Sequence, residues 1–430
     1  MLIDFIPFII TFVLIFLNVP VAISMITGSF LYFAFIETGF SLTNVIQNLV
    51  SSNMSTDLLT IPYFIVMGVV MNYAGITARL MNFCESLIGH KVGGLAQVNV
   101  LLSTLNGGIC GSSIADAAVQ CKILVPEMEK KGYSREFSAA VTAASGLIAP
   151  MIPPGNNMIL YAVIAGCSVT RMFFCGYVPG LLMCILEMII VSVISHKRNY
   201  LPSREKRASL KEILFSFVQS IWAIIIAGVL IIGVRLGFFT IIEGAVVVII
   251  MGLLVGLLFY KTFTIRDLPK IAIEAFREVS SIMLMIIGAL CFGMYLSWAR
   301  IPQTVASAMI NTISSQFGFM VIAMLLLLVF GMLLNGASLL LIFTPLLWPI
   351  AQMYGINVYV FGILMIINAS IGALTPPVGG VMYTVMKITK VSMPAFTKEV
   401  MPFIIGLLIL MIIFLVFPDI ILWLPNLLYK

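Results

Sequence analysis

The sequence predicts an all-α, multi-pass membrane protein made of two inverted repeats, each with five spans and one re-entrant hairpin. Of its 430 residues, 61% are hydrophobic and only 9% are charged, whereas a typical soluble domain is about 25% charged. Two long apolar segments, half a chain apart, are each interrupted by a Pro-Pro pair, at 153–154 and at 376–377. These pairs belong to a set of proline and glycine positions that recurs at one constant offset, which indicates an internal repeat.

Ten apolar stretches have the length and composition of membrane spans, which need about 20 residues. We expect them at 5–18, 20–36, 58–74, 136–166 (broken), 172–195, 213–234, 239–260, 279–299, 357–386 (broken) and 400–417. Asp4 precedes the first stretch and no basic segment leads into it. We therefore expect this stretch to be a span rather than a cleaved signal peptide.

Two further apolar stretches, 93–128 and 317–354, are too short for two spans and too long for one. A limb of about 17 residues reaches roughly 25 Å as a helix, which is short of a hydrocarbon core of about 30 Å. Both stretches have a small, polar midpoint, at 106–113 and at 335–338. We therefore expect two re-entrant hairpins, each of which enters and leaves the membrane on one side.

The spans at 136–166 and 357–386 should break in mid-membrane, because proline removes a backbone donor and clashes with the preceding turn. Broken backbone at that depth persists only where it lines a cavity enclosed by protein. A matched pair of breaks, one in each half, is the strongest sequence indication of a transporter's binding site. Segments 145–157 and 368–380 are therefore predicted to form such a site.

Basic residues set the expected orientation in the membrane. If the loop at 197–212 is cytoplasmic, the order of the spans places 19 of the 23 Lys and Arg residues on that side, in agreement with the positive-inside rule. The other four are Arg171, Arg235, Arg300 and Lys430. This orientation predicts that both termini lie outside, that the first hairpin opens inward and that the second opens outward.

The internal repeat has an offset of 223 residues. At this offset Pro126 matches Pro349 and Gly132 matches Gly355, and the two Pro-Pro pairs also match. Each half holds five spans and one hairpin, and the odd number of crossings turns the second copy upside down relative to the first.

Two segments, 76–88 and 265–279, carry apolar residues at helical spacing with charges between them. Such segments are typical of helices in the membrane interface, and they are either arms that link a fixed scaffold to a moving domain or ordinary connectors. The expected parts of the chain are scaffold spans with an arm (1–92), the first half of a transport domain (93–166), scaffold spans with the cytoplasmic loop and a second arm (167–316), the second half of the transport domain (317–390) and a C-terminal span (391–430).

Each hairpin tip should approach the broken span of its own half and offer hydroxyl, amide and carbonyl oxygens. Neutral oxygens suit a monovalent cation such as Na⁺, whereas Mg²⁺ and Ca²⁺ favour carboxylates. The candidate Na⁺-binding residues are Ser112, Ser113, Ser145, Gly146, Pro150, Asn335, Gly336, Asn368, Gly372 and Thr375.

Helix N-termini at the same breaks carry partial positive charge and favour an anionic group of a substrate. The candidate substrate-binding residues are Arg300, Asn156, Asn157, Ser338 and Thr375. Arg300 follows a span end, where its guanidinium has the geometry to hold a carboxylate through two hydrogen bonds. The alternative role of Arg300 is that of an interface anchor.

Few other side chains suggest chemistry. Asp116 follows the first tip and either supports the cation site or ties the hairpin by hydrogen bonds, while Glu187 is expected to be a structural or subunit contact. The seven cysteines lie mostly in apolar segments without ligand-like spacing, and there are only two histidines, so we expect no transition metal and no cofactor. The net charge of +6 comes from loop residues and does not indicate nucleic-acid binding.

Five stretches of the sequence carry a resemblance to a known family. They are Gly-Ser-Ser-Ile-Ala-Asp-Ala-Ala at 111–118, Ile-Leu-Val-Pro-Glu-Met at 123–128, Ala-Ala-Val-Thr-Ala-Ala-Ser at 139–145, Ile-Ala-Pro-Met-Ile-Pro-Pro at 148–154 and Ile-Gly-Ala-Leu-Thr-Pro-Pro-Val-Gly at 371–379. Together they resemble the large membrane subunit of TRAP transporters, the tripartite ATP-independent periplasmic transporters of bacteria. The sequence departs from the usual pattern at Asn335, where the family commonly has an acidic residue, and at 155–157, which leaves the substrate open.

The resemblance implies a Na⁺-driven importer of organic acids in the bacterial inner membrane that works by an elevator motion. It also implies two separate partners, a small four-span membrane subunit and a periplasmic substrate-binding protein, besides the membrane lipid around the chain. The implied substrate is a sialic acid, another sugar acid or a C4-dicarboxylate. The position of Arg300 varies among members of the family, and in sialic-acid members an arginine there resembles a substrate ligand.

Other functions are less well supported by the sequence. The main alternative is a stand-alone sodium–dicarboxylate symporter with a similar inverted-repeat fold. A channel or a structural membrane subunit is a further alternative, although a channel would need a continuous polar stripe rather than two blind hairpins. We expect no enzyme, because no paired aspartates, His-Glu-x-x-His motif or Ser/Lys dyad occurs at matching depth.

Overall fold

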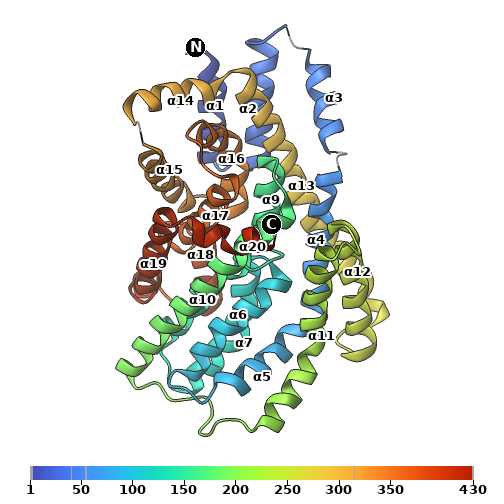
Figure 1. The fold of residues 1–430 in the computed structure, drawn as a ribbon, viewed down its shortest axis with the longest axis vertical. Coiled ribbons are helices and arrows are strands. Elements are labelled where there is room, and N and C mark those ends of the chain that lie inside the picture. The colour runs from blue at the N-terminus through green and yellow to red at the C-terminus, as the bar shows by residue number, and fades with distance from the viewer. Residues whose placement is uncertain (1–2, 40, 54–55, 314, 429–430) are drawn as a thin grey trace.

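The structure is a computed structural model that describes residues 3–39, 41–53, 56–313 and 315–428, and its regular elements there are all helical (Figure 1). The first half contains η1 (Ile3–Phe5), α1 (Ile6–Phe16), α2 (Val21–Phe35), α3 (Leu42–Asn53), α4 (Thr56–Tyr73), α5 (Ile76–Ile88), α6 (Gly94–Cys110), α7 (Ser113–Lys130), α8 (Arg135–Ser145), η2 (Ala149–Met151), α9 (Asn156–Ala165) and α10 (Val169–Arg198). The second half contains α11 (Leu210–Arg235), α12 (Ile241–Leu254), η3 (Val255–Phe259), η4 (Ile265–Asp267), α13 (Leu268–Trp298), α14 (Ile301–Thr312), α15 (Gln316–Gly331), α16 (Gly336–Met353), α17 (Val358–Leu374), α18 (Gly380–Thr389), α19 (Met393–Val416) and α20 (Asp419–Leu428).

The prediction of a helical, multi-pass membrane protein is confirmed. Among the described residues, six helices are long and apolar enough to cross a membrane on their own. The span predicted at 136–166 is broken at its Pro-Pro pair, where segments Arg135–Met151 and Asn156–Ala165 meet at 42°. The span predicted at 357–386 breaks in the same way between α17 and α18.

Both predicted hairpins form. Helices α6 and α7 pack side by side, as do α15 and α16, and Figure 1 shows the two pairs toward opposite ends of the molecule. The turn of the first pair requires Gly111, whose φ of +59° lies in the left-handed region that glycine adopts without strain. Each pair thus forms a helical hairpin, and the second limb of the second pair, Gly336–Met353, is one of the six helices long enough to cross a membrane.

Element boundaries recur at the offset read from the sequence. Helices α7 and α16 begin 223 residues apart, and so do α8 and α17. Ser134 and Asn357 cap α8 and α17 with their side chains. Gly132 and Gly355 precede these caps and both have positive φ. The structure therefore repeats the same sequence of hairpin, cap and broken span in both halves.

The arm helices differ in part from the prediction. Helix α5 is separate and meets α4 at 67°, but the segment Ile265–Trp298 runs as one continuous rod of 34 residues, so 265–279 is not a separate interfacial helix. Pro269 stands in the first turn of α13, where proline is tolerated, and no later residue breaks the helix. The counterpart of α5 at the repeat offset is α14, which follows Arg300 and begins with Ile301-Pro302.

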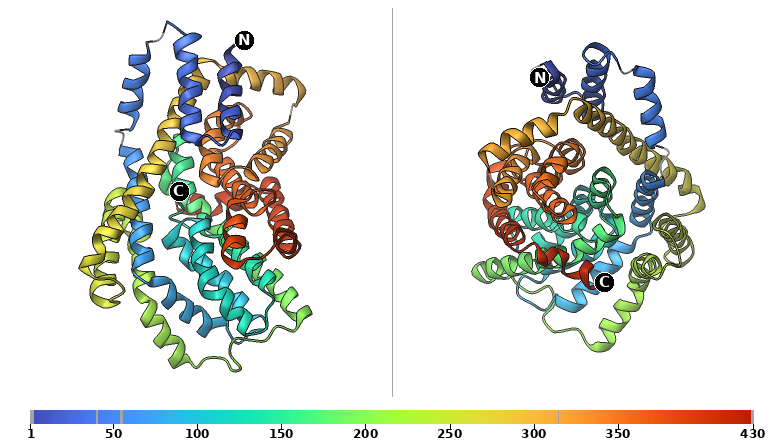
Figure 2. Two further views of the ribbon diagram at one scale, coloured as in Figure 1. Left: turned by 180° about the vertical axis from the view of Figure 1, so that it is seen from behind. Right: turned by 45° about the horizontal axis from the view of Figure 1, so that its top comes forward.

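The helices form two groups. Figure 2 shows α1–α4 and α11–α13 along one side of a cluster made of the hairpins and broken spans. Helix α10 packs against α6, α9 and α19, and α19 packs against α8 and α17. Helix α10 lies in the range 167–316, where scaffold spans are expected, and it also packs against α20.

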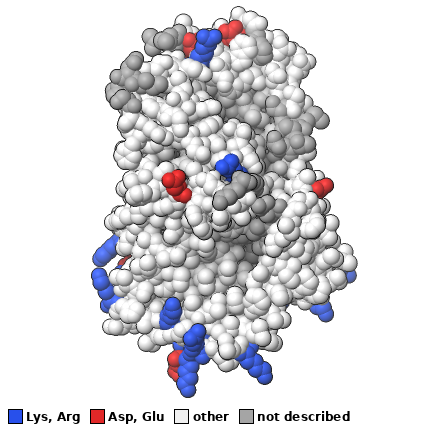
Figure 3. Space-filling view, in the orientation of Figure 1, with Lys and Arg blue, Asp and Glu red and all other residues white. Residues whose placement is uncertain are grey.

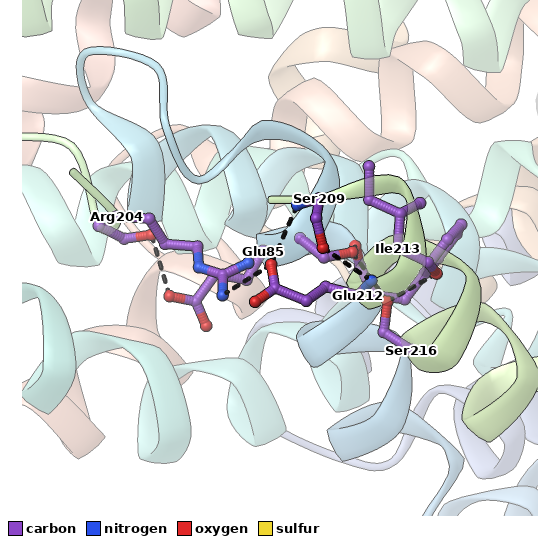
Figure 4. Close-up of polar contacts among 9 residues, drawn as sticks. Glu85, Arg204, Ser209, Glu212, Ile213 and Ser216 are labelled. Atoms are coloured by element: carbon purple, nitrogen blue, oxygen red, sulfur yellow. Dashed lines mark hydrogen bonds and ion pairs between the residues drawn. The ribbon is translucent and has the colours of Figure 1, made fainter. Parts of the chain in front are cut away.

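The arm α5 packs against α6 of the hairpin cluster on one side and against α11 on the other. Ser86 Oγ lies 2.9 Å from Ser216 Oγ on α11, and Ser203 Oγ donates to Glu85 Oε1 at 3.0 Å. Figure 4 shows Glu85 of α5 and Ser216 of α11 beside the capping box that begins α11, where Ser209 and Glu212 cap each other's backbone. The end of the molecule that carries these contacts is also where Lys and Arg side chains gather in Figure 3.

Candidate functional site

A cavity of about 130 Å³ lies where the two hairpin tips meet the two broken spans. Its walls come from both halves of the chain and from α13 of the other helix group. The lining residues are Gly111, Ser112, Ser113, Ile114, Asn156, Asn157, Leu160, Ile282, Asn335, Gly336, Ala337, Ala369, Ser370, Ala373 and Gly380. Six of the residues predicted from the sequence are therefore brought together: Ser112, Ser113, Asn156, Asn157, Asn335 and Gly336.

The first tip is docked on the break of its own half. Asn156 N donates to Gly111 O at 3.3 Å, and a Cβ on Gly111 would lie 2.8 Å from Pro154 O. Ser112 caps α7 by accepting a hydrogen bond from Ala115 N. The tip therefore needs glycine at 111, and the Ser112 hydroxyl lies at the helix start beside the cavity.

The second tip closes the cavity from the other half. Asn335 caps α16, with its Oδ1 accepting from Ser338 N at 2.8 Å. A Cβ on Gly336 would lie 3.1 Å from Asn157 Nδ2, so this tip touches the broken span of the first half. Such a cross-half contact was not expected, because the sequence analysis paired each tip only with its own break.

Four helix N-termini converge on this cavity. They are the starts of α7 at Ser113, α9 at Asn156, α16 at Gly336 and α18 at Gly380. Each helix start carries about half a positive charge. The lining contains no Asp, Glu, Lys or Arg, so the partial charges of the helix starts favour an anion there.

Behind the first tip, Ser145 and Gly146 end α8. Ser145 Oγ donates to Asn99 Oδ1 at 2.9 Å, and Asn99 Nδ2 donates to Thr142 Oγ1 at 2.7 Å. A Cβ on Gly146 would lie 3.0 Å from Ser113 O. The structure thus adds Asn99 and Thr142 to the predicted oxygen-rich corner.

Pro150 completes this first corner. It lies in η2, and its carbonyl oxygen would be 2.2 Å from a Cβ on Gly155. The oxygens of the corner belong to hydroxyl, amide and carbonyl groups, which are the ligands expected for a monovalent cation.

The predicted residues of the second corner are also close to one another. Asn368 is fully buried, and its Nδ2 donates to Met324 O at 2.7 Å. Its Oδ1 has no partner among the described residues. Thr375 Oγ1 donates to Ile371 O at 2.6 Å, and Gly372 packs directly on the backbone of Gly331.

Three of the five predicted substrate-binding residues, Arg300, Ser338 and Thr375, do not line the cavity. Arg300 is exposed, at the junction of α13 and α14, with φ of +52°. Ser338 is 1% exposed, with its Oγ 3.7 Å from Met285 Sδ on α13. The structure therefore does not bring Arg300 to this cavity, and it places Ser338 at the contact between α16 and α13.

Ser370 was missed by the sequence analysis. It lines the cavity from α17, and its buried hydroxyl has no partner among the described residues. The only signal in the sequence is its position two residues after Asn368, within a stretch of small residues, which helix packing explains equally well.

Asp116 lies at the centre of a buried polar network in the first hairpin. Its carboxylate accepts from Ser103 Oγ at 2.7 Å, Asn106 Nδ2 at 2.6 Å and Gln120 Nε2 at 2.7 Å. Asn106 in turn accepts a hydrogen bond from Thr77 of α5 at 3.1 Å. Asp116 therefore ties the two limbs of the hairpin together and links them to the arm, which agrees with one of its two predicted roles.

A second cavity, of about 400 Å³, continues from the first tip between α4 and α13. It shares Ser112, Ile114, Asn156 and Ile282 with the first cavity. The other lining residues are Ile65, Gly68, Val69, Asn72, Ala115, Ala118, Glu278 and Ser281. The candidate site is thus continuous with a cleft between the two helix groups.

Metal-binding clusters were also sought. Within the described ranges, no group of three His, Cys, Asp or Glu side chains is placed to hold a metal ion. The described cysteines are free and mostly buried.

The chain is similar to known transporter proteins over nearly its whole length. Residues 8–420 match the family model described as "Tripartite ATP-independent periplasmic transporter, DctM component". The chain is 34% identical to the sialic acid TRAP transporter permease protein SiaT of Haemophilus influenzae, over 99% of this chain and 68% of that protein. It is 32% identical to the large permease protein SiaM of Vibrio cholerae, over 96% of each chain.

A solved transporter structure has a similar fold. The YdaH transporter of Alcanivorax borkumensis superposes with a TM-score of 0.65 at 14% identity, covering 87% of this chain and 88% of that one. Because the sequence match spans almost the entire chain and its relatives are transporter permeases, the chain belongs to the DctM component family of the tripartite ATP-independent periplasmic transporters.

Proposed function

We propose that this permease imports an organic acid by coupling it to Na⁺, with the substrate delivered by a periplasmic substrate-binding protein. The observation that carries the proposal is the convergence of four helix N-termini on one cavity whose lining holds no charged side chain. A carboxylate suits such a cavity, because backbone N–H groups and helix dipoles stabilise negative charge there.

The relatives support the substrate class. Besides the sialic acid permeases, the chain is 31% identical to the C4-dicarboxylate TRAP transporter large permease protein DctM of Pseudomonas aeruginosa, over 86% of each chain. Sialic acids and C4-dicarboxylates share the carboxylate that the cavity favours. In this proposal Asn156, Asn157 and Ser370 hold the substrate together with the helix starts.

The coupling ion is proposed to bind in the corners behind the tips. The first corner is formed by Ser112, Ser113, Ser145, Gly146 and Pro150 with Asn99. The second is formed by Asn335, Gly336, Asn368, Gly372 and Thr375. Neutral oxygens at the ends of α8 and α17 support a monovalent cation, because helix C-termini also carry partial negative charge.

The proposed motion is that of an elevator. The hairpins, broken spans, α10 and α19 would move as one block against α1, α2, α4 and α11–α13. The packing of α10 and α19 on the broken spans and the contacts of α5 with α11 support this division. In the proposed orientation both termini are periplasmic, the permease lies in the inner membrane, and a small four-span subunit accompanies it.

Uptake by reconstituted liposomes tests the proposal. The permease with its small subunit should take up organic acid only with a matching binding protein and an inward Na⁺ gradient. Full uptake by this chain alone would instead favour a stand-alone sodium–dicarboxylate symporter. Uptake that is indifferent to Na⁺ would overturn the coupling.

Ser145→Ala should raise the Na⁺ concentration for half-maximal uptake about fivefold, because one oxygen of the first corner is lost at a cost of about 1 kcal/mol. Na⁺ titration of the initial uptake rate measures this. Ser138→Ala is the matched control, since Ser138 is also buried on α8 but bonds only Ser134 O. Equal Na⁺ dependence in both variants would exclude Ser145 as a ligand.

Arg300→Ala should change KM for the substrate less than twofold, whereas Asn156→Ala should raise it about fivefold through the loss of a hydrogen bond in the cavity. The reason is that Asn156 lines the cavity and Arg300 is exposed elsewhere. Uptake kinetics at saturating Na⁺ separate the two. A tenfold rise in KM for Arg300→Ala would instead assign the carboxylate to Arg300 in another state of the cycle.

A further inference from the structure

A groove of about 570 Å³ lies between the α5–α6 connection and the last turns of α10. The proposed function does not use it. We call it the α10 groove, and its lining residues are His90, Lys91, Val92, Gln97, Ile185, Met188, Ile189, Ser192 and His196. It opens on the surface, on the side of the molecule that holds the basic loop at 197–212.

The walls of the α10 groove are held together by close packing at Gly93 and by two hydrogen bonds. Gly93 has φ of +72°, and a Cβ there would lie 2.2 Å from Ser195 Oγ. Gly93 N donates to Tyr200 O at 3.3 Å, and Gln97 Nε2 donates to Met188 O at 2.9 Å. The connection therefore packs directly on α10, and the groove is a formed feature of the fold.

The polar end of the groove is basic. Lys91 and His196 are exposed there, Ser192 adds a hydroxyl, and the lining contains no Asp or Glu. His196 Nδ1 pairs with Ser192 O at 2.7 Å, which leaves Nε2 directed elsewhere. His90 Nδ1 is buried without a partner in the described part of the chain. Lys91 and Ser192 can donate hydrogen bonds to an oxyanion, and Lys91 supplies a full positive charge, whereas His196 donates from Nε2 only as the imidazolium because its Nδ1 proton already goes to Ser192 O.

The other end of the groove is aliphatic and continues along the helix. Leu181, Ile185, Ile189 and Val193 are 50%, 53%, 56% and 49% exposed. Their spacing of four residues aligns them on one face of α10. The twelve helical rises from Leu181 to Val193 cover about 18 Å. Half the thickness of a hydrocarbon core is about 15 Å. The stripe therefore has the length of one leaflet.

We propose that the α10 groove binds an anionic phospholipid of the cytoplasmic leaflet, with its phosphate at Lys91, Ser192 and His196 and an acyl chain along the stripe. The inference rests on the proposed orientation, in which the loop at 197–212 is cytoplasmic. A basic pocket at that face of a membrane protein favours anionic headgroups, and free phosphate would leave the aliphatic stripe unused.

The groove lies where the connection between α5 and α6 meets α10, so a lipid bound there would contact both segments. His90 and Lys91 belong to the connection that leads from the arm α5 to the first hairpin, whereas Ser192 and His196 belong to α10. A bound lipid would therefore stabilise the packing of the connection against α10.

The experiment uses the purified permease with its small subunit, delipidated in detergent. Phosphatidylglycerol, phosphatidylcholine and inorganic phosphate are added separately, and bound lipid is counted by native mass spectrometry alongside the thermal transition. Wild type should retain phosphatidylglycerol about tenfold better than phosphatidylcholine, and phosphate alone should not shift the transition. Removing the charge of Lys91 should lower the retention of phosphatidylglycerol about fivefold.

The double variant Lys91→Gln/His196→Gln should lose the preference for phosphatidylglycerol, and Lys197→Gln should keep it. Lys197 is the matched control, because it neighbours His196 but does not line the groove. An unchanged preference in the double variant, or no preference in wild type, would overturn the proposal. A wild-type transition of the double variant in phosphatidylcholine shows that it is folded, and labelling the 197–212 loop with an impermeant reagent tests the orientation separately.

Discussion

Cross-linking Ser338→Cys to Met285→Cys is expected to stop uptake completely while leaving the binding protein able to dock. Ser338 Oγ and Met285 Sδ are 3.7 Å apart, on α16 of the hairpin cluster and α13 of the other group. A short thiol cross-linker would therefore join the two groups in the arrangement described here. If transport requires the groups to slide past each other, no further turnover follows.

Controls for the cross-link come from the same pair. Each single cysteine variant, treated with the same reagent, should transport at its untreated rate, which accounts for the native cysteines. A reducible cross-linker should restore uptake when it is cleaved. Uptake that persists at high cross-linking yield would exclude an elevator motion of α16 against α13.

Gly372→Ala is expected to abolish uptake and lower the thermal stability of the permease. A Cβ at 372 would lie 2.5 Å from the carbonyl carbon and 2.6 Å from the Cα of Gly331, so it would meet backbone that cannot rotate away. Overpacking a tight contact costs about 1–3 kcal/mol, and here it would also push α15 away from α17 beside the second cation corner. Thermal unfolding and uptake measure the two effects.

Gly228→Ala is the matched control for this substitution. Gly228 is also in a helix, but the nearest atom to its Cβ position is Ile232 Cδ1 at 4.0 Å. Alanine favours helix over glycine by about 1 kcal/mol, so this variant should be as stable as wild type or slightly more so. Wild-type stability and uptake in Gly372→Ala would show that α15 and α17 can separate without cost.

The breaks and tips were predictable because proline and glycine act locally. A Pro-Pro pair ends a helix wherever it stands, and a glycine at a helix end permits a left-handed turn. The tip at Gly111 and the break before Asn156 therefore follow from a few neighbouring residues. Their coincidence at one offset also indicated that the two halves share an architecture.

The cavity lining was only partly predictable, because it depends on which elements meet in space. Ser370 and Gly380 carry no local signal that separates them from packing residues, and they line the cavity because α17 and α18 approach the first half. The contact of Gly336 with Asn157 likewise joins residues from opposite halves. Each tip was expected to contact the break of its own half, because nothing in the sequence near Gly336 indicates a contact with the other half.

The segment at 265–279, predicted as a second arm, could form either a separate helix or the start of the following span. The stripe at 265–279 suggested a separate helix, yet nothing after Pro269 interrupts the backbone, and cooperative helix formation carries α13 through to Trp298. The break comes instead at Arg300, just before Ile301-Pro302. This proline marks the break in the sequence, but the prediction treated the position only as the end of a span. Arg300 stands in this turn with φ of +52°.

The cleft between α4 and α13 has a consequence for inhibition. Its walls include Asn72, Glu278 and Ser281 from one helix group and Ala115 and Ala118 from the other, so a small molecule wedged there would immobilise the permease without imitating its cargo. Because Asn156 also lines this cleft, a compound that reached it would compete with the cargo, whereas one held only by the outer walls would be non-competitive. Its selectivity among related permeases would depend on wall residues that the cargo does not need to recognise, and resistance could arise there without loss of uptake.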